Sequence, residues 1–272
     1  MNYKIIFTDL DRTLLNNEMR LSEENRLAIQ QYVDMGGVFV PNSGRSIGEI
    51  PDEVTELPEV RFVIGSNGAD IYDKQTGEHI GAAMTREEVA KVFDILSEYE
   101  VFLGVHYHGD GYVDADRLDL EIMRYYNVDD YFGQYYLDTN LPHKEFDAFC
   151  RGMEEVEMVC AFFRSPEGQE ACHTRLQEEG FMVASSHAHN IEIFSPSAGK
   201  GNAVRRLAAH LGIACEETVA MGDSKNDLSM LEAAGLGLAV ANGSEITKAN
   251  ADAVICRNDE HIMPYVMKKY IR

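Results

Sequence analysis

Two acidic residues, Asp9 and Asp11, follow the apolar run Ile5-Ile6-Phe7 near the start of the chain, with only Thr8 between the run and Asp9. The run predicts a short buried strand that ends at the two carboxylates. Like charges held this close repel each other and are costly to remove from water, so stability does not explain them. A cation bound between the acids would explain them, as would one acid acting as a nucleophile while the other transfers protons.

A second acidic motif strengthens this interpretation. Gly222-Asp223-Ser224-Lys225-Asn226-Asp227 follows another apolar run near the other end of the chain. Asp9, Asp11 and Asp223 together supply hard oxygen ligands of the kind that Mg²⁺ prefers. The two motifs therefore indicate a magnesium site with a reactive carboxylate.

Two further segments carry groups that suit phosphoryl oxygens. Asn42-Ser43-Gly44-Arg45 follows a predicted strand, where Ser43 offers a hydroxyl and Gly44 an unobstructed backbone N–H at the start of a helix. Lys200 begins another predicted helix and adds a positive charge. These groups favour a ligand that carries a phosphate.

Strands and helices alternate at both ends of the chain, which favours a parallel, doubly wound sheet. In the first third we expect strands at 4–8, 38–41 and 61–65, a helix at 22–35, a helical stretch at 46–56 that Pro51 interrupts early, and a hairpin of 70–73 with 78–82. The pattern resumes with helices at 200–211, 226–234 and 259–270 and strands at 218–221 and 236–241. At the carboxyl edge of such a sheet the four polar segments converge, and ligands bind there.

The middle of the chain has a different pattern. Residues 101–107 and 112–115 flank Gly109-Asp110-Gly111, which predicts a β-hairpin. We expect further strands at 157–164, 181–186 and 190–194, and helices at 85–98 and 167–179. The sequence thus predicts an α/β core made of residues 1–83 and 195–272, with an α+β domain, residues 84–194, inserted as a lid.

These motifs, in this order, resemble the haloacid dehalogenase (HAD) superfamily, and within it the Cof-type, sugar-phosphatase-like branch with an α+β cap. The resemblance covers essentially the whole chain and includes Ser66-Asn67-Gly68-Ala69 and Val240-Ala241-Asn242-Gly243. It implies a Rossmann-like parallel core with an inserted cap that determines substrate specificity. Two positions depart from the family pattern: Arg12 replaces the usual Gly, and Ser43 replaces the commoner Thr while keeping the hydroxyl.

The resemblance implies a Mg²⁺-dependent phosphatase that hydrolyses small phosphomonoesters, sugar or polyol phosphates, through an aspartyl-phosphate intermediate. Asp9 would be the nucleophile and Asp11 the general acid and base. Asp9, Asp11 and Asp223 would hold the metal. The phosphate- and substrate-binding residues would be Ser43, Gly44, Lys200 and Asn226, with supporting roles for Asp227, Arg45, Asn67 and Asn242.

Several of these residues also have a plain structural interpretation. Asp227 suits the positive end of a helix dipole whether or not it has a catalytic role. Arg45 could form a structural salt bridge on its helix, and Asn67 and Asn242 could only shape turns. Arg12 could contact solvent, the cap or the substrate.

Histidines in the middle segment offer a weaker signal. His106 and His108 are expected to share one face of a strand, as would His187 and His189 if that segment is extended. A surface of the cap that faces substrate, a metal site and ordinary packing are the alternatives, and His106 and His108 are our candidates for cap specificity.

Composition limits the other function classes. The formal net charge of −22 comes without a basic stripe and argues against nucleic-acid binding. No apolar stretch reaches the roughly 18 residues of a membrane span, and the five scattered cysteines fit reduced thiols. We expect a cytoplasmic monomer or weak homodimer whose partner is a phosphorylated small molecule. The rival functions are a phosphosugar mutase and a phospho-ligand sensor without significant turnover.

Overall fold

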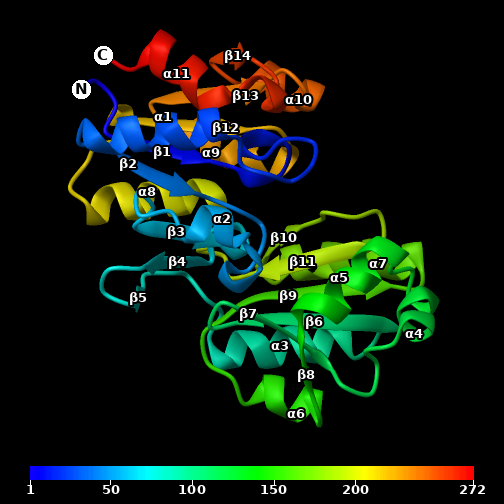
Figure 1. The fold of residues 1–272 in the computed structure, drawn as a ribbon. Helices are drawn as coiled ribbons and strands as arrows, with labels where there is room; N and C mark the ends of the chain where they lie inside the picture. Colours follow the sequence, from blue (N-terminus) through cyan, green and yellow to red (C-terminus); the bar gives the residue numbers. More distant parts are fainter. The chain divides into compact units, whose positions relative to one another are not determined.

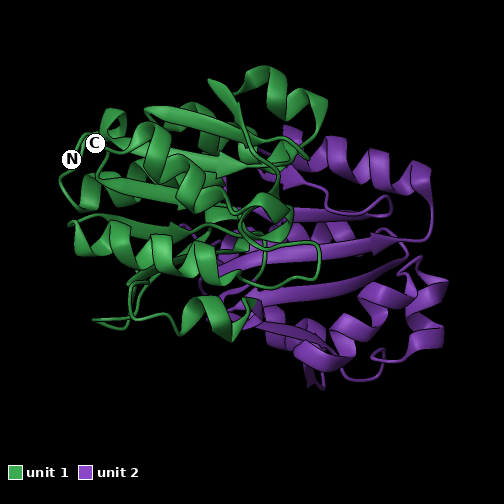
Figure 2. Cartoon of the chain, turned by 45° about the horizontal axis from the view of Figure 1, so that its top comes forward, with its two compact units in different colours: residues 1–45, 50–81, 199–272 green, residues 46–49, 82–198 purple.

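The computed structural model describes residues 1–272, and the chain divides into two compact units (Figure 2). The first unit contains residues 1–45, 50–81 and 199–272. The second contains residues 82–198 together with the short segment 46–49. This short segment is separated in sequence from the rest of its unit and was not expected there.

A five-stranded parallel sheet forms the centre of the first unit, in the order β14-β13-β12-β1-β2. Its strands are β1 (Ile5–Thr8), β2 (Val38–Pro41), β12 (Thr218–Gly222), β13 (Leu236–Val240) and β14 (Ala253–Ile255). In Figure 1 the blue strands come from the start of the chain and the orange strands from its end. Thr8 of β1 pairs with Met221 on one side and with Pro41 on the other, so the carboxyl ends of these three strands are aligned.

Helices bury both faces of this sheet. The helices of this unit are α1 (Glu23–Asp34), α2 (Asp52–Thr55), α8 (Lys200–His210), α9 (Leu228–Ala233), α10 (Glu245–Asn250) and α11 (Ile262–Tyr270). Apolar residues of α8 and α9 pack in one core with Ile5, Phe7 and Val40 of the sheet. Ile6 and Phe39, which alternate with those residues and therefore point to the other face, are also fully buried.

The helical stretch expected at 46–56 is interrupted at Pro51, as predicted, and is not a continuous helix on either side of it. Its residues form a 3₁₀ turn, Ile47–Glu49, and the single-turn helix α2, because Pro51 ends one and begins the other. Three antiparallel strands follow: β3 (Phe62–Gly65), β4 (Asp70–Asp73) and β5 (Glu78–His79).

The second unit has a six-stranded sheet in the order β10-β11-β9-β6-β7-β8. Its strands are β6 (Val101–Tyr107), β7 (Asp110–Asp114), β8 (Leu141–His143), β9 (Val156–Phe163), β10 (Met182–Ala184) and β11 (Asn190–Phe194). Its helices are α3 (Arg86–Leu96), α4 (Leu120–Tyr125), α5 (Asp130–Thr139), α6 (Phe146–Arg151) and α7 (Pro166–Glu178). None of the helices in the chain is both long enough and apolar enough to span a membrane.

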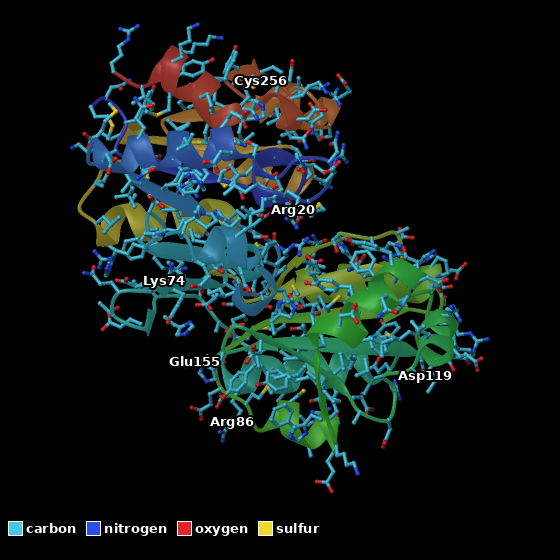
Figure 3. The ribbon with its side chains drawn as sticks, in the orientation of Figure 1. Arg20, Lys74, Arg86, Asp119, Glu155 and Cys256 are labelled. Atoms are coloured by element: carbon cyan, nitrogen blue, oxygen red, sulfur yellow. The ribbon has the colours of Figure 1, made fainter.

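Local capping explains two of these helices. Thr85 and Glu88 form a capping box at the start of α3, whose first residue, Arg86, is labelled in Figure 3. Asp119, also labelled in Figure 3, accepts hydrogen bonds from the backbone N–H groups of Glu121 and Ile122 and so begins α4. The sequence analysis had predicted α3 but not α4.

The turn of the β6–β7 hairpin lies one residue earlier than Gly109-Asp110-Gly111. Tyr107 pairs with Asp110, so His108 and Gly109 are the two turn residues, and both have positive φ. A two-residue turn of this kind matches the twist of the strands. His108 therefore lies in the turn, and the expectation that it shares a strand face with His106 is wrong.

Candidate active site

The two acids of the first motif follow β1 and have different surroundings. Asp9 is buried, and its backbone N–H donates to the carbonyl of Met221 at 2.9 Å, which extends the pairing of β1 with β12. Asp11 lies in the loop that follows, and two-fifths of its side chain is exposed. The buried acid is thus held rigidly, while the second has access to solvent.

Lys200 lies between two carboxylates. Its Nζ is 2.7 Å from Asp9 Oδ1 and 2.7 Å from Asp227 Oδ1, and the lysine side chain is fully buried. Burial opposes its charge, but the carboxylates of Asp227 and Asp9 outweigh that effect and raise the pKa of Lys200. The lysine is therefore a fixed, buried cation and not a residue exposed to solvent.

Asp227 organises the second acidic motif. Its Oδ2 accepts hydrogen bonds from the backbone N–H groups of Asp223 at 3.0 Å and Ser224 at 3.1 Å. Gly222 has no side chain because a Cβ there would lie only 2.5 Å from the Cβ of Asp227. Asp227 thus fixes both the loop that carries Asp223 and the ammonium of Lys200.

Three carboxylates gather at this point. One oxygen from each of Asp9, Asp223 and Asp227 lies within 4.8 Å of the others. Burial and the neighbouring Asp227 raise the pKa of Asp223 to about 6, and the same two causes raise the pKa of Asp9. Crowded, partly desolvated acids of this kind are stabilised by a cation.

The donor set fits Mg²⁺. Three carboxylates and one lysine ammonium leave a formal charge of about −2, which a divalent cation neutralises. All the available ligands are hard oxygens, as Mg²⁺ requires. Asp227 is one of the three carboxylates whose oxygens lie close together, although we had expected it only in a supporting role.

The loop after β2 places Ser43 and Arg45 beside the first motif. Ser43 is fully buried, and its Oγ accepts the backbone N–H of Arg45 at 3.2 Å. The Arg45 guanidinium donates to both carboxylate oxygens of Asp11, at 3.0 and 2.8 Å. Arg45 therefore orients Asp11, a contact that residue spacing alone did not reveal.

Asn67 and Asn226 meet near Gly44. Asn226 Nδ2 donates to Asn67 Oδ1 at 3.0 Å, and Asn67 adopts a left-handed backbone with φ of 50°. A Cβ on Gly44 would lie 3.3 Å from that same Asn67 oxygen. The structure thus brings together three of the predicted polar segments at one place.

Asn242 supports the loop that follows Asp11. Its Nδ2 donates to the carbonyl of Arg12 at 2.8 Å, and the Arg12 guanidinium donates back to the Asn242 carbonyl at 3.3 Å. Arg12 has a φ of 60°, which explains why glycine is usual there, and its Nε lies 3.8 Å from Asp223 Oδ2. Asn258 belongs to none of the predicted motifs, and the sequence analysis missed it. Its Nδ2 donates a hydrogen bond to the carbonyl of Leu15, in the loop that follows Asp11.

The cap histidines lie in the second unit. His106 is buried, with Nε2 at 3.5 Å from Glu49 Oε2, while His108 is exposed and its ring lies against Tyr107. His187 and His189 lie in the turn between β10 and β11 rather than on an extended strand. A role for His106 and His108 in specificity stays a prediction.

Comparisons with known proteins agree with this geometry. The family of haloacid dehalogenase-like hydrolases matches residues 6–266. Phosphatase YwpJ of Bacillus subtilis is 35% identical, over 97% of this chain and 99% of its own. The 5-amino-6-(5-phospho-D-ribitylamino)uracil phosphatase YwtE of the same organism is 29% identical, over 98% of both chains.

A solved structure of a haloacid dehalogenase-like hydrolase from B. subtilis superposes with a TM-score of 0.80 at 30% identity, over 98% of this chain and 99% of its own. The predicted resemblance and the predicted fold class, a parallel α/β core with an inserted α+β cap, are confirmed. The chain therefore belongs to the haloacid dehalogenase-like hydrolase family and is a phosphoric monoester hydrolase.

Proposed function

We propose that this chain is a Mg²⁺-dependent phosphatase of small sugar or polyol phosphates that works through a phosphoryl group carried on Asp9. The observation that carries the proposal is the buried Asp9 carboxylate held at 2.7 Å by Lys200, with Asp11 two residues further along and oriented by Arg45. A rigid nucleophile beside an independently held proton donor is what two-step phosphoryl transfer requires.

In the first step an Asp9 oxygen forms a bond to phosphorus while the bond from phosphorus to the leaving oxygen breaks. Asp11 gives its proton to that leaving oxygen. In the second step Asp11 takes a proton from water, the water oxygen bonds to phosphorus, and the bond to Asp9 breaks. Inorganic phosphate leaves and the Asp9 carboxylate is restored.

The remaining residues bind and orient. Ser43, the Gly44 N–H, Lys200 and Asn226 would hold the phosphoryl oxygens, and Asp227 would keep Lys200 and the Asp223 loop in place. The Asp9 and Asp223 carboxylates and the Asp11 carbonyl would hold Mg²⁺. When bound, the ion supplies charge neutralisation between the acids and a dianionic phosphate.

The second unit, with residues 84–194 as its main part, would act as the cap. A cap that closes on the core leaves room for a small ligand and excludes bulk water. The relative YwtE is named for a ribityl phosphate, which is a polyol phosphate, and this supports the proposed substrate class. His106 and His108 are our candidates to influence which phosphates are preferred.

A phosphate-release assay over sugar phosphates, polyol phosphates and p-nitrophenyl phosphate tests the proposal. Asp9→Asn should lose at least about 10³-fold in kcat because the amide keeps the size of the side chain but is not a nucleophile. Asp73→Asn is the matched control, since Asp73 is also a buried aspartate of the first unit but pairs with Arg61.

Activity should also disappear with excess chelator and return with Mg²⁺. If Asp9→Asn keeps more than about a tenth of the wild-type rate, covalent catalysis by Asp9 is wrong. Transfer to a sugar hydroxyl without release of phosphate would instead identify a mutase.

A further inference from the structure

The segment Ser46–Glu49 leaves the first unit immediately after the phosphate-binding loop. Arg45 belongs to the first unit, Ser46–Glu49 to the second, and Ile50 to the first again (Figure 2). The chain therefore crosses between the units at this segment as well as at residues 81–82 and 198–199. At this crossing Ser46 directly follows Arg45 in the chain, and Ser43 lies two residues before Arg45.

Side chains and backbone of the second unit hold the segment firmly. The N–H of Gly48 donates to the carbonyl of Gly109 at 2.8 Å. A Cβ on Gly48 would lie 3.0 Å from that same carbonyl oxygen, so the two backbones are in close contact. The segment is therefore attached to the turn of the β6–β7 hairpin.

Glu49 is the centre of this attachment. Its carboxylate is buried and accepts the N–H of Ser46 at 2.9 Å, while Asn140 Nδ2 donates to it at 3.3 Å and His106 Nε2 lies at 3.5 Å. Burial acts to raise the pKa of Glu49, but His106 and the Ser46 hydrogen bonds lower it overall. A buried carboxylate with partners from β6, the α5–β8 junction and its own turn fixes the position of the segment.

The other side of the crossing is fixed to the reacting groups. The Arg45 carbonyl accepts the N–H of Ser66 at 2.7 Å, its N–H donates to Ser43, and its guanidinium binds Asp11. Only the peptide bond between Arg45 and Ser46 separates these contacts from those of Glu49. A change in the position of Ser46 must therefore be absorbed by the backbone of Arg45.

We propose that Glu49 is a positioning residue for the phosphatase reaction: by fixing Ser46–Glu49 in the cap, it sets the backbone of Arg45 and, through it, the orientation of Asp11 and Ser43. The inference rests on the proposed function of Asp9 and Asp11. It gives the cap a part in the chemical step that is separate from contact with the leaving group. Every substrate should depend on Glu49 to the same degree, since Asp11 and Ser43 serve all of them.

The test measures kcat and KM for p-nitrophenyl phosphate and for two sugar phosphates. In Glu49→Ala we expect kcat to fall by about 10- to 100-fold on all three, with the ranking of substrates unchanged, because small misplacement of reacting groups is costly. Val159→Ala removes buried volume from the core of the second unit, far in sequence from the crossing, and should lower Tm with kcat unchanged. If Glu49→Ala does not fold, Glu49→Gln replaces it. The amide keeps an acceptor for the Ser46 N–H but loses the charge beside His106, so kcat should fall by only about threefold, equally on all three substrates, and an unchanged kcat would overturn the inference.

A double variant shows whether Glu49 acts through Arg45. If it does, Arg45→Lys with Glu49→Ala should be no more than about twofold to threefold slower than Arg45→Lys alone. Fully multiplying effects on kcat, a changed substrate ranking, or a kcat that falls as much in Val159→Ala would each overturn the inference.

Binding of inorganic phosphate in the presence of Mg²⁺, measured by calorimetry, gives a readout that does not need turnover. We expect the phosphate Kd to rise about tenfold in Glu49→Ala and to stay unchanged in Val159→Ala. An equal Kd in wild type and Glu49→Ala overturns the role of Glu49 even if the phosphatase function is right. If the wild type releases no phosphate from any phosphomonoester, the proposed function is wrong. The comparison of phosphate Kd between wild type and Glu49→Ala still tests the positioning role in that case.

Discussion

Replacing Lys200 by methionine should destabilise the protein strongly. The substitution keeps most of the volume of the side chain but removes an ammonium that lies 2.7 Å from both Asp9 and Asp227. These two carboxylates are 9% and 0% exposed, so water cannot replace the lost charge. Breaking one buried ion pair by removing a partner typically costs about 3–5 kcal/mol, and here two carboxylates lose their partner at once.

The desolvation of the lysine itself is recovered in the variant, which offsets part of that loss. We therefore expect the free energy of unfolding to fall by about 3–5 kcal/mol. At about 2–4 °C per kcal/mol for a unit of this size, the Tm of the first unit should drop by roughly 6–20 °C. Urea unfolding without added metal, followed by circular dichroism, measures the loss.

A second variant separates charge from packing. Asp227→Asn combined with Lys200→Met removes one of the two isolated carboxylates and should recover roughly half of the lost stability, because fewer uncompensated charges stay buried. If Lys200→Met is within about 1 kcal/mol of wild type, or if the second substitution adds to the loss, the lysine does not compensate these acids as we describe.

Two further predictions concern the first unit. Arg12 has a φ of 60°, a conformation that costs a residue with a side chain about 1–2 kcal/mol. Arg12→Gly should therefore be more stable to urea than Arg12→Ala by about 1 kcal/mol. The opposite order would mean that the backbone at this position is not strained. The hydrogen bond from Arg61 lowers the pKa of Asp73 to about 2, which is below its value in the unfolded chain. The pair therefore stabilises the fold above about pH 4, and this contribution is lost as the pH falls toward 2. Asp73→Asn should accordingly lose about 1–2 kcal/mol at pH 7 and little at pH 2.5, and a loss that does not vary with pH would contradict the argument.

Predictions from the sequence succeeded where a local pattern has a physical consequence. The apolar runs before Asp9 and Asp223 became parallel strands with aligned ends, so the acids of both motifs had to meet at one edge of the sheet. Lys200 was found because it begins the helix that follows the inserted segment. These inferences need only the period of the pattern and the topology of the sheet.

Other features depend on contacts between residues distant in sequence, which no local pattern contains. The pairing of Arg45 with Asp11 is one, and the placement of Glu49 beside His106 is another. Helix α4 was missed because it is a short helix that begins at the capping Asp119 and has a single buried side chain, Met123, so its periodicity is weak. His108 was misplaced because a residue with a side chain occupies a left-handed turn position that glycine usually takes.

The central strand of the first sheet has consequences for synthesis of the protein on the ribosome. Ile5 of β1 pairs with Val38 of β2 but also with Thr218 of β12, so one edge of β1 has no partner until most of the chain has been made. Residues 82–198 of the second unit, by contrast, are contiguous and emerge earlier, so this unit can fold first. Asp9 and Lys200 meet only after the last third of the chain emerges. A truncated nascent chain therefore exposes an apolar strand edge and lacks this buried ion pair.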